Sequence, residues 1–426
     1  MSVEMKDSGI AWIGEIPNDW KISLLSSLFF EHSLKNIGMQ ENNLLSLSYG
    51  KIIRKNIDEN GGLLPASFEG YNIISPNDIV FRLTDLQNDK RSLRTGLCME
   101  KGIITSAYIT IRKRDNKLSS RYFHYLLHSY DECKVFYGIG NGVRQGMNYQ
   151  DLRKLLLPFP PTKEEQSRIA NFLDKKCAEI DELIALQEQM IAQLNTYKQT
   201  VITETVTKGL NPNVKMKDSG VEWIGEIPEH WDVKRLKQES IFINGYAFNS
   251  EDFKLEEGVK VIRIGDIGFK VDFENCVRSI TNANILDSFR IKDGDILIAM
   301  SGATTGKSCF VEKTEEAYIN QRVGIIRSLI RKIIYYSLQT PYFMEFVNLK
   351  NFGSAQPNIS SKAIGEFPIM VMPELEQQSI AQYLDQKCKE IDELISIKKE
   401  KIEHLKAYKK SVIYEYVTGK KQISDN

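Results

Sequence analysis

The sequence predicts an α+β protein in which two mixed α/β domains lie at opposite ends of a long antiparallel two-helix coiled coil. Two repeats, both at an offset of 211 residues, support this prediction. Residues 5–20 (MKDSGIAWIGEIPNDW) and 216–231 (MKDSGVEWIGEIPEHW) are identical at twelve of sixteen positions. Residues 165–184 and 376–395 are identical at fourteen of twenty positions. The chain is therefore a tandem duplication with an internal pseudo-twofold repeat.

The repeats enclose two inserts, residues 21–157 and 232–368, whose sequences look almost unrelated. Because the frame is kept while the inserts differ, we infer that the inserts select something and the frame positions them. Strand-like and helical runs alternate in both inserts. The expected strands are 78–83, 103–112, 259–264, 295–300 and 322–327, and the expected helices are 119–130 and 333–347.

A long helix is predicted over the second repeated block of each copy. Thr162 and Glu165, directly after two prolines, fit a capping box at a helix start. Three apolar rows per heptad follow, and the pattern stops at Gly209 and at Gly419, as helix ends prefer. Each helix is about 45 residues and so about 65 Å long. Such a helix needs a partner for its apolar stripe, and the other copy is the obvious one.

The connection between the copies fixes the direction of the helices. Only residues 210–215 join the first helix to the second copy, so the second helix can return antiparallel along the first. By symmetry, the motif at 5–20 should lie near the C-terminal end of the second helix. We expect its Trp12, Ile16 and Trp20 to form an aromatic clasp that joins the insert to the helices. A docking surface for another subunit is the second interpretation.

Composition limits the class of protein. The chain of 426 residues is 42% hydrophobic and is long enough for two domains with their own cores. Its apolar runs are too short to span a membrane, and no hydrophobic signal segment leads the chain. Six cysteines never form a CxxC pair, which argues against a zinc site and against a disulfide framework. We therefore expect a cytoplasmic protein without a membrane partner.

Charge is distributed unevenly although the formal net charge is +0. Residues 86–117 carry eight basic side chains against three acids, and residues 317–344 carry four basic side chains and no acid. One such stretch in each insert favours an anionic partner over a merely solvated surface.

Motifs that suggest catalysis fail on inspection. SGATTGKS at 301–308 invites a phosphate-loop interpretation, but Ser301 stands where the motif needs glycine. A glycine turn whose backbone N–H groups and Lys307 approach a DNA phosphate is the milder interpretation. His124 and His128 lack an intervening Glu, so packing is favoured over metal binding. Glu132-Cys-Lys134 resembles half of a nuclease site, but no Pro-Asp strand precedes it.

The arrangement resembles the specificity subunit of type I restriction–modification systems across essentially the whole chain. The motifs that carry the resemblance are the duplicated D-S-G-x-x-W-I-G-x-I-P-x-x-W, the GDILIAMSGATTGKS turn at 294–308, and E-Q-x-x-I-A-x-x-L-D at 165–174 and 376–385. The first insert departs from the family pattern, because TDLQNDKRSLRTG stands where the glycine turn would be.

The resemblance implies a non-catalytic subunit whose inserts are target recognition domains, each reading one half of a split double-stranded DNA sequence. It implies domains at 1–160 and 211–372, a spacer helix at 161–210, and a distal spacer helix with the C-terminal tail at 373–426. Two modification (methyltransferase) subunits would bind the helices for adenine-N6 methylation, and restriction/motor subunits would join for cleavage. No cofactor is expected in this chain, since S-adenosylmethionine, ATP and Mg would sit on the partner subunits. The alternative is a coiled-coil assembly scaffold without direct DNA readout.

Candidate residues follow from side-chain chemistry, since Arg or Lys suits guanine and Asn or Gln suits adenine. The DNA-binding candidates are Lys90, Arg91, Arg94, Arg112, Arg114, Arg144, Gln145, Ser301, Thr304, Thr305, Lys307, Gln321, Arg322, Gln356 and Asn358. A strict coiled coil uses two apolar positions per heptad and these helices use three, so the third row is expected to bind the partner subunits. That row is Ile169, Leu183, Met190, Tyr197, Ile380, Leu394 and Tyr408.

Overall fold

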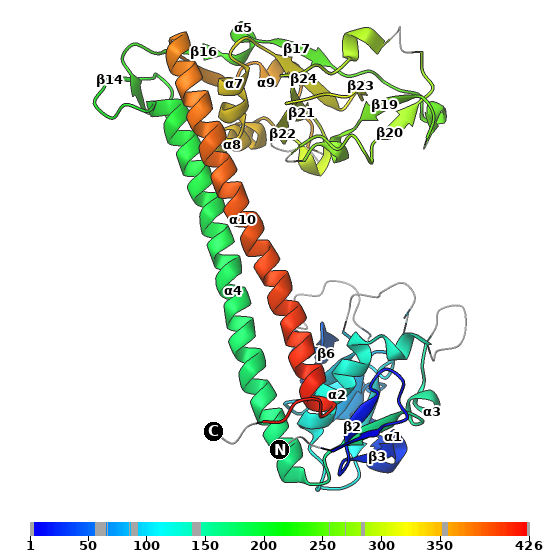
Figure 1. Ribbon diagram of the computed structural model, residues 1–426. Coiled ribbons are helices and arrows are strands. Elements are labelled where there is room, and N and C mark those ends of the chain that lie inside the picture. Colours follow the sequence, from blue (N-terminus) through cyan, green and yellow to red (C-terminus); the bar gives the residue numbers. More distant parts are fainter. Residues whose placement is uncertain are drawn as a thin grey trace. The chain divides into compact units, whose positions relative to one another are not determined.

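The computed structural model describes residues 4–55, 65, 67–84, 86, 93–138, 146–254, 256–268, 270–282, 286–351 and 357–423. The chain divides into two compact units. Unit 1 is Met1–Glu188 with Lys399–Asn426, and unit 2 is Gln189–Lys398. Both units combine strands with helices, so the mixed α/β class predicted from the sequence is confirmed (Figure 1).

Two long helices contribute to both units: α4 spans Lys163–Lys208 and α10 spans Glu374–Val417. One half of the expected capping box at the start of α4 is present, because the Glu165 N–H donates to Thr162 Oγ1 over 3.3 Å. Both helices end within two residues of the predicted glycines. Gly209 and Gly419 have φ values of +76° and +72°, a backbone conformation that side chains with a Cβ rarely adopt.

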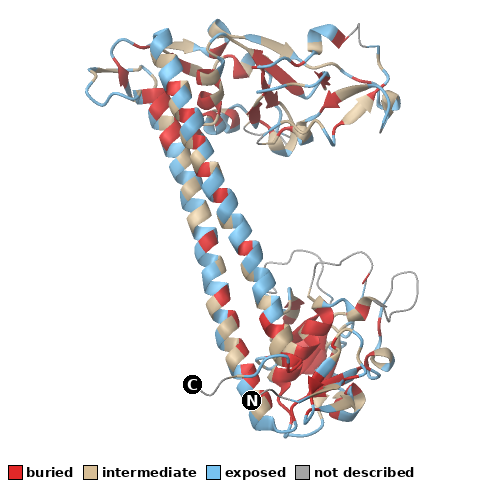
Figure 2. Ribbon diagram, viewed as in Figure 1, coloured by how far each residue is buried: buried red, intermediate tan, exposed pale blue. Residues whose placement is uncertain are grey.

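Contacts between α4 and α10 run in opposite directions along the two helices. In unit 1 the rings of Phe172 and Tyr416 lie 4.4 Å apart, and Lys409 Nζ lies 2.7 Å from Asp181. In unit 2 Lys198 Nζ lies 2.6 Å from the Asp392 carboxylate. Figure 2 shows buried positions on both helices alternating with exposed ones. The buried positions include Ala170, Leu173, Cys177, Ile180, Leu384, Cys388, Ile391 and Ile395, so each helix buries one apolar face.

Unit 1 contains short strands and one substantial helix besides the long ones. In chain order its elements are β1 (Met5–Asp7), β2 (Glu15–Pro17), β3 (Lys21–Leu24), α1 (Leu25–Leu28), β4 (Phe29–Glu31), β5 (Leu34–Lys35), β6 (Leu45–Ser48), β7 (Lys51–Arg54), β8 (Asn72–Ile74), β9 (Ile79–Phe81), β10 (Thr95–Leu97), β11 (Gly102–Ile104), β12 (Ile109–Lys113), α2 (Ser120–Glu132), the 3₁₀ turn η1 (Val135–Gly138), α3 (Tyr149–Leu152) and β13 (Leu156–Phe159). An antiparallel sheet has the strand order β10-β9-β12-β4.

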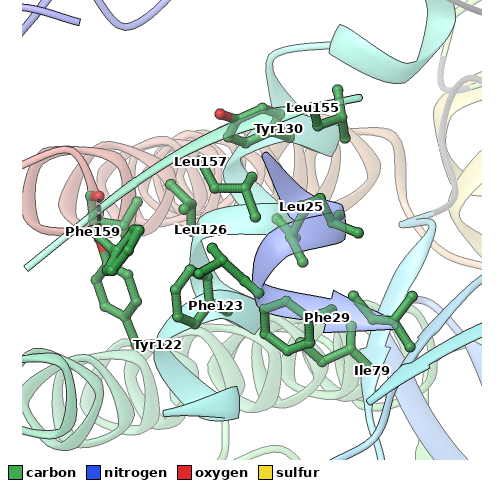
Figure 3. Packing of buried hydrophobic residues seen from close by; sticks show 14 of the residues in the cluster. Leu25, Phe29, Ile79, Tyr122, Phe123, Leu126, Tyr130, Leu155, Leu157 and Phe159 are labelled. Atoms are coloured by element: carbon green, nitrogen blue, oxygen red, sulfur yellow. Dashed lines mark hydrogen bonds between the residues drawn. The ribbon is translucent and has the colours of Figure 1, made fainter. Parts of the chain in front are cut away.

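The core of unit 1 lies between this sheet, α2 and the long helices. Figure 3 shows Phe29 and Ile79 of the sheet beside Phe123 and Leu126 of α2. The same cluster continues into α4 through Leu173 and into the end of α10. One apolar core therefore holds the insert on the helices.

Unit 2 also combines short strands with short helices. They are β14 (Met216–Asp218), β15 (Glu226–Pro228), β16 (Asp232–Arg235), α5 (Leu236–Glu239), β17 (Ile241–Asn244), η2 (Ser250–Asp252), β18 (Phe253–Lys254), β19 (Val259–Ile262), η3 (Ile264–Asp266), β20 (Val277–Ser279), η4 (Asp287–Phe289), β21 (Ile296–Ala299), η5 (Gly302–Thr304), β22 (Ser308–Phe310), β23 (Ala317–Ile319), β24 (Val323–Arg327), α7 (Arg331–Leu338), α8 (Pro341–Lys350), α9 (Ser361–Ile364) and β25 (Pro368–Val371). Its main antiparallel sheet has the order β17-β24-β21-β22.

The two main sheets are equivalent although the inserts differ in sequence. Read in the same direction, their orders are β4-β12-β9-β10 and β17-β24-β21-β22, and in each the second strand follows the third along the chain. The same ion pair fixes both. Arg112 on β12 binds Asp78 before β9 with two hydrogen bonds of 2.7 and 2.8 Å. Arg327 on β24 binds Asp295 before β21 with bonds of 2.7 and 2.9 Å.

Two expected elements are interrupted. The run 103–112 is two strands, β11 and β12, because a turn intervenes in which the Tyr108 N–H donates to the Thr105 carbonyl over 3.1 Å. The run 333–347 is two helices, α7 and α8. Pro341 starts α8 and Thr340 caps it, so one continuous helix across this position was a wrong prediction.

The repeat motifs join the inserts to the helices, as the first interpretation held. In unit 1 Tyr414 Oη of α10 donates to the Trp12 carbonyl over 3.2 Å, and Trp20 is buried. Motif 5–20 therefore lies against the C-terminal end of α10, as expected. In unit 2 Trp231 is fully buried beside Val206 of α4 and Leu384 of α10 in one cluster.

The paired Arg–Asp contacts predict a specific stability effect. Asp295 is 3% exposed, so Asp295→Ala leaves the guanidinium of Arg327 without its carboxylate and should lower the local stability of β21 by about 3 kcal/mol. Hydrogen exchange of the β21 amides measures that stability. The double replacement Asp295→Leu with Arg327→Met removes both charges and should lose much less. Equal losses in the single and double variants would contradict the ion-pair account.

Candidate nucleic-acid interface

The glycine turn of unit 2 connects β21 to β22 as neighbouring antiparallel strands, with Ile298 opposite Ser308. A phosphate loop needs a helix directly after the loop, and here a strand follows, so the sheet topology argues against nucleotide binding of that kind. The turn instead contacts the segment before α9. Ser301 forms a β-bridge with Asn358, and the Gly302 N–H donates to the Pro357 carbonyl over 2.9 Å. Two candidates that lie 57 residues apart in sequence are thus neighbours.

A polar hollow of about 550 Å³ opens beside this contact. Its polar lining comes from the end of β17, the β23–β24 connection, the end of α8 and the start of α9, and it consists of Asn244, Gln321, Lys350, Asn358, Ser360 and Ser361. The side chains of Asn244, Gln321 and Asn358 form no hydrogen bond with any other residue in the described part of the chain, and all three residues are exposed. Their amide donors and acceptors are therefore available to a ligand.

Only part of this lining was predicted from the sequence. Gln321 and Asn358 were candidates, whereas Asn244, Lys350, Ser360 and Ser361 were missed. No spacing in the sequence relates these residues, because four separate elements bring them together. The cue that was available is chemical: polar amides at the ends of otherwise apolar strands and helices.

Candidates within the glycine turn have different roles. Thr305 is buried and its Oγ1 donates to the Gly302 carbonyl over 2.7 Å, so it stabilises the turn. Ser301 Oγ and Thr304 Oγ1 are buried and form no hydrogen bond within the described residues. Lys307 is exposed, but it lines a different hollow of about 810 Å³, formed with α7 and the long helices of unit 2. The structure does not bring Lys307 together with Gln321.

Basic candidates of the first insert are mostly engaged within the fold. Arg94 has no exposed surface; its backbone N–H donates to Asp131 and its Nη1 to the Thr84 carbonyl over 3.1 Å. Arg112 is bound to Asp78. Arg114 is exposed, although its Nε donates to the Ser26 carbonyl over 2.9 Å. The candidates Lys90, Arg91, Arg144, Gln145 and Gln356 lie outside the described residues.

The basic stretch at 317–344 is also partly neutralised. Arg327 binds Asp295, and Lys332 Nζ lies 2.9 Å from the Asp385 carboxylate. Arg322 is exposed and forms no ion pair with a described residue. Local charge in the sequence therefore overstated the basic surface, because acids from distant positions pair with these side chains.

The histidines of α2 are partly buried. Burial lowers the pKa of His124 to about 3 and that of His128 to about 4, so both are neutral at physiological pH. Among the described residues no group of three or more His, Cys, Asp or Glu is arranged to hold a metal ion. Likewise, no helix in the described ranges is long and apolar enough to cross a membrane.

The third apolar row of the long helices is exposed along most of its length. Leu183, Tyr197, Leu394 and Tyr408 are 45–55% exposed, and Met190 is half-buried. The row ends inside the fold, because Ile169 and Ile380 are buried in the cores of the two units. Two further apolar residues at equivalent positions, Leu186 and Ile397, are also exposed.

The family model of the type I restriction modification DNA specificity domain matches residues 98–196 and 228–407, more than half of the sequence. The chain belongs to this family. It is a type I restriction–modification specificity subunit, and as such it is non-catalytic. The coiled-coil scaffold without DNA readout is not favoured by this membership.

Two curated relatives of this specificity subunit come from Methanocaldococcus jannaschii. The type I restriction enzyme MjaVIII specificity subunit is 28% identical over 336 residues, which cover 76% of each chain. The putative type I restriction enzyme MjaX specificity subunit is 26% identical over 431 residues, covering 96% of this chain and 95% of the relative. A solved structure described as the basis of complex assembly and conformational transition of the type I R-M system is 18% identical, with a TM-score of 0.71. It covers 95% of this chain and 99% of that chain, which supports the fold.

Proposed function

We propose that this specificity subunit reads a bipartite double-stranded DNA target with two recognition domains, at 1–160 and 211–372. The helices at 161–210 and 373–426 form the antiparallel coiled coil that spaces them. One observation carries the proposal: two inserts of almost unrelated sequence share the same sheet order and the same Arg–Asp pair. Two copies of one fold with different surfaces are what the reading of two different half-sites requires.

The proposed chemistry of recognition is clearest in the second domain. Asn and Gln side chains can donate to and accept from adenine in the major groove, and Lys or Arg can bind guanine or phosphate. Gln321, Asn358 and Asn244 converge on one polar hollow and have unused hydrogen-bonding groups. We propose that bases are read at this hollow, next to the bridge between Ser301 and Asn358, with Arg322 following Gln321 in sequence.

The remaining partners follow from the family. Two modification subunits would methylate adenine N6, and restriction/motor subunits would translocate and cut DNA. S-adenosylmethionine, ATP and Mg would be bound by those subunits, and the complex would act in the cytoplasm.

Exchange of one insert tests the two-reader proposal. Replacing residues 21–157 with the corresponding insert of a related subunit should change one half-site of the methylated sequence and leave the other half-site and the spacer intact. The reciprocal control, exchange of 232–368, should change only the other half-site. Methylome sequencing of a host with and without the gene gives the readout. A change of both half-sites by one exchange is incompatible with two separate readers.

Lys307 and Gln321 should contribute to DNA binding in different ways. As a phosphate contact, Lys307→Ala should weaken binding to all sequences and lower the slope of log K against log salt by about one unit. Gln321→Ala should cost about 1–3 kcal/mol at one base pair and relax specificity there. Lys313→Ala, at an exposed lysine of the same domain, is the matched control. An unchanged salt slope for Lys307→Ala returns the glycine turn to a purely structural role.

The exposed third row should bind the modification subunits. Residues 162–208 hold six basic and eight acidic side chains, so this surface offers phosphate no net attraction. Four exposed apolar side chains at repeat-equivalent positions, Leu183 with Leu394 and Tyr197 with Tyr408, suit two copies of one protein partner.

We therefore expect Leu183→Asp with Leu394→Asp to abolish assembly with the modification subunits, because a carboxylate cannot be buried there unpaired. Size-exclusion chromatography of the mixed subunits measures assembly. Ala185→Asp with Ser396→Asp, which adds the same charges at other exposed helix positions, should assemble normally. Recovery of an intact complex with two modification subunits from the leucine double variant rules the row out as the interface.

A further inference from the structure

Each insert contacts a long helix through a tyrosine, and the two tyrosines occupy equivalent positions in the two copies. In unit 1 Tyr125 Oη of α2 donates to Asp174 of α4 over 2.7 Å. In unit 2 Tyr336 Oη of α7 donates to Asp385 of α10 over 2.6 Å. The two tyrosines are 211 positions apart, and so are the two aspartates. The duplication therefore extends into inserts that otherwise look unrelated.

A basic side chain completes each contact. Arg121, one turn before Tyr125 on α2, forms an ion pair with Asp174. Lys332, one turn before Tyr336 on α7, forms the equivalent pair with Asp385. One carboxylate on the helix therefore accepts hydrogen bonds from two consecutive turns of an insert helix, which fixes the rotation of that helix better than one bond does.

The carboxylate one heptad further along each long helix ties the two long helices together. Asp181 binds Lys409 over 2.7 Å in unit 1, and Asp392 binds Lys198 over 2.6 Å in unit 2. Insert and helix pair are thus joined by the same two contacts in both units. The mutual spacing of seven residues keeps both carboxylates on one helix face.

A hollow lies beside each of these contacts, between the insert and the long helices. On one side of Tyr125 lies the apolar core, and on the other lies a hollow of about 750 Å³ that Tyr125 and Cys177 line. In unit 2 a hollow of about 810 Å³ is lined by Tyr336 and Cys388. The insert is therefore not packed against the helices on the hollow side, where the tyrosine, aspartate and basic side chains provide the connection. Rocking of the insert about its core would open or close the hollow, and these contacts resist it.

Both tyrosines remain donors under physiological conditions. Burial is the largest cause that raises the pKa of Tyr125, and burial followed by the bond to Asp385 raises the pKa of Tyr336. The hydroxyls therefore stay protonated, and the aspartates are half-exposed carboxylates that accept from them.

We propose that these tyrosine–aspartate contacts fix the tilt of each recognition domain on the helices and so restrict the spacer length of the DNA target. The positioning contacts are Tyr125–Asp174 with Arg121, and Tyr336–Asp385 with Lys332. This inference rests on the proposed bipartite function. Half-site sequence is read elsewhere, so loosening the contacts changes the tolerated distance between half-sites without changing the half-sites themselves.

The test uses two double variants in the complex with the modification subunits. One combines Tyr125→Phe and Tyr336→Phe, and the other combines Asp174→Ala and Asp385→Ala. Methylome sequencing gives the methylated fraction at sites whose spacer is one base pair longer or shorter than the native one. That fraction, relative to native sites, should rise about tenfold, the change expected when a hydrogen bond to a charged group is lost. The single variant Tyr336→Phe should give part of this rise.

A matched control lies on the same helices. Lys176–Glu179 and Lys387–Glu390 are also repeat-equivalent ion pairs, but each lies within one helix and forms no hydrogen bond or ion pair with a described insert residue. Glu179→Gln with Glu390→Gln should leave spacer selectivity unchanged. A uniform fall in methylation at all sites, with native spacer selectivity, would show that the tyrosine contacts only stabilise the fold and overturns the proposal.

A measurement without DNA separates this inference from the proposed function. Spin labels at Glu257 of the insert and Gln382 of α10, both exposed, report how unit 2 holds its insert on α10. The distance distribution should broaden in Asp385→Ala and remain narrow in Glu390→Gln. An unchanged distance distribution overturns the positioning role, even if the variant methylates no DNA. A broadened distribution, in a protein whose methylated target is not bipartite, refutes the proposed function and leaves the positioning role intact.

Discussion

The fold depends on the contact between a tryptophan of each repeat motif and the glycine that ends a long helix. A Cβ on Gly209 would lie 3.1 Å from the ring of Trp231, and one on Gly419 would lie 2.3 Å from Pro17 and 3.2 Å from the Trp20 ring. Both glycines have positive φ, so they reverse the chain at the helix end where a larger residue would be strained. The helix can then stop directly against the aromatic ring and bury it.

Each of these tryptophans also holds the start of the other long helix. Trp231 Nε1 donates to Glu376 in the first turn of α10 over 2.8 Å, while its ring packs against the end of α4. The start of one helix, the end of the other and the insert thus meet at a single side chain. This explains physically why sixteen residues and a helix start recur together at one offset: a change in any of the three would leave a cavity or an unpaired polar group.

The features that could be predicted from the sequence are those whose partners are near in sequence or repeated. Helix starts, glycine ends, the inward apolar rows and the position of motif 5–20 all follow from local spacing and from the duplication. The burial of Arg94 could not be predicted in this way. Its hydrogen-bond acceptors, Asp131 and the Thr84 carbonyl, come close to Arg94 only when the sheet and α2 have folded. The pairing of Arg112 with Asp78 was hidden for the same reason, across 34 residues.

The tyrosine–aspartate contacts were hidden for a different reason. Alignment at the 211 offset pairs Tyr125 with Tyr336, but most neighbours differ, so the match stands out only once the carboxylates are seen beside it. The polar hollow had no signal of this kind, since strand and helix ends build it. The tyrosine–aspartate contacts and the polar hollow differ in how freely their residues can be replaced. Residues that set geometry must keep their partners in the repeated frame. The side chains of Gln321 and Asn244, in contrast, are exposed and form no hydrogen bond with a described residue, so they can change without disturbing the sheet. A fixed Arg–Asp pair at one end of the sheet and exposed amides at the other end allow new surfaces to arise on an unchanged core.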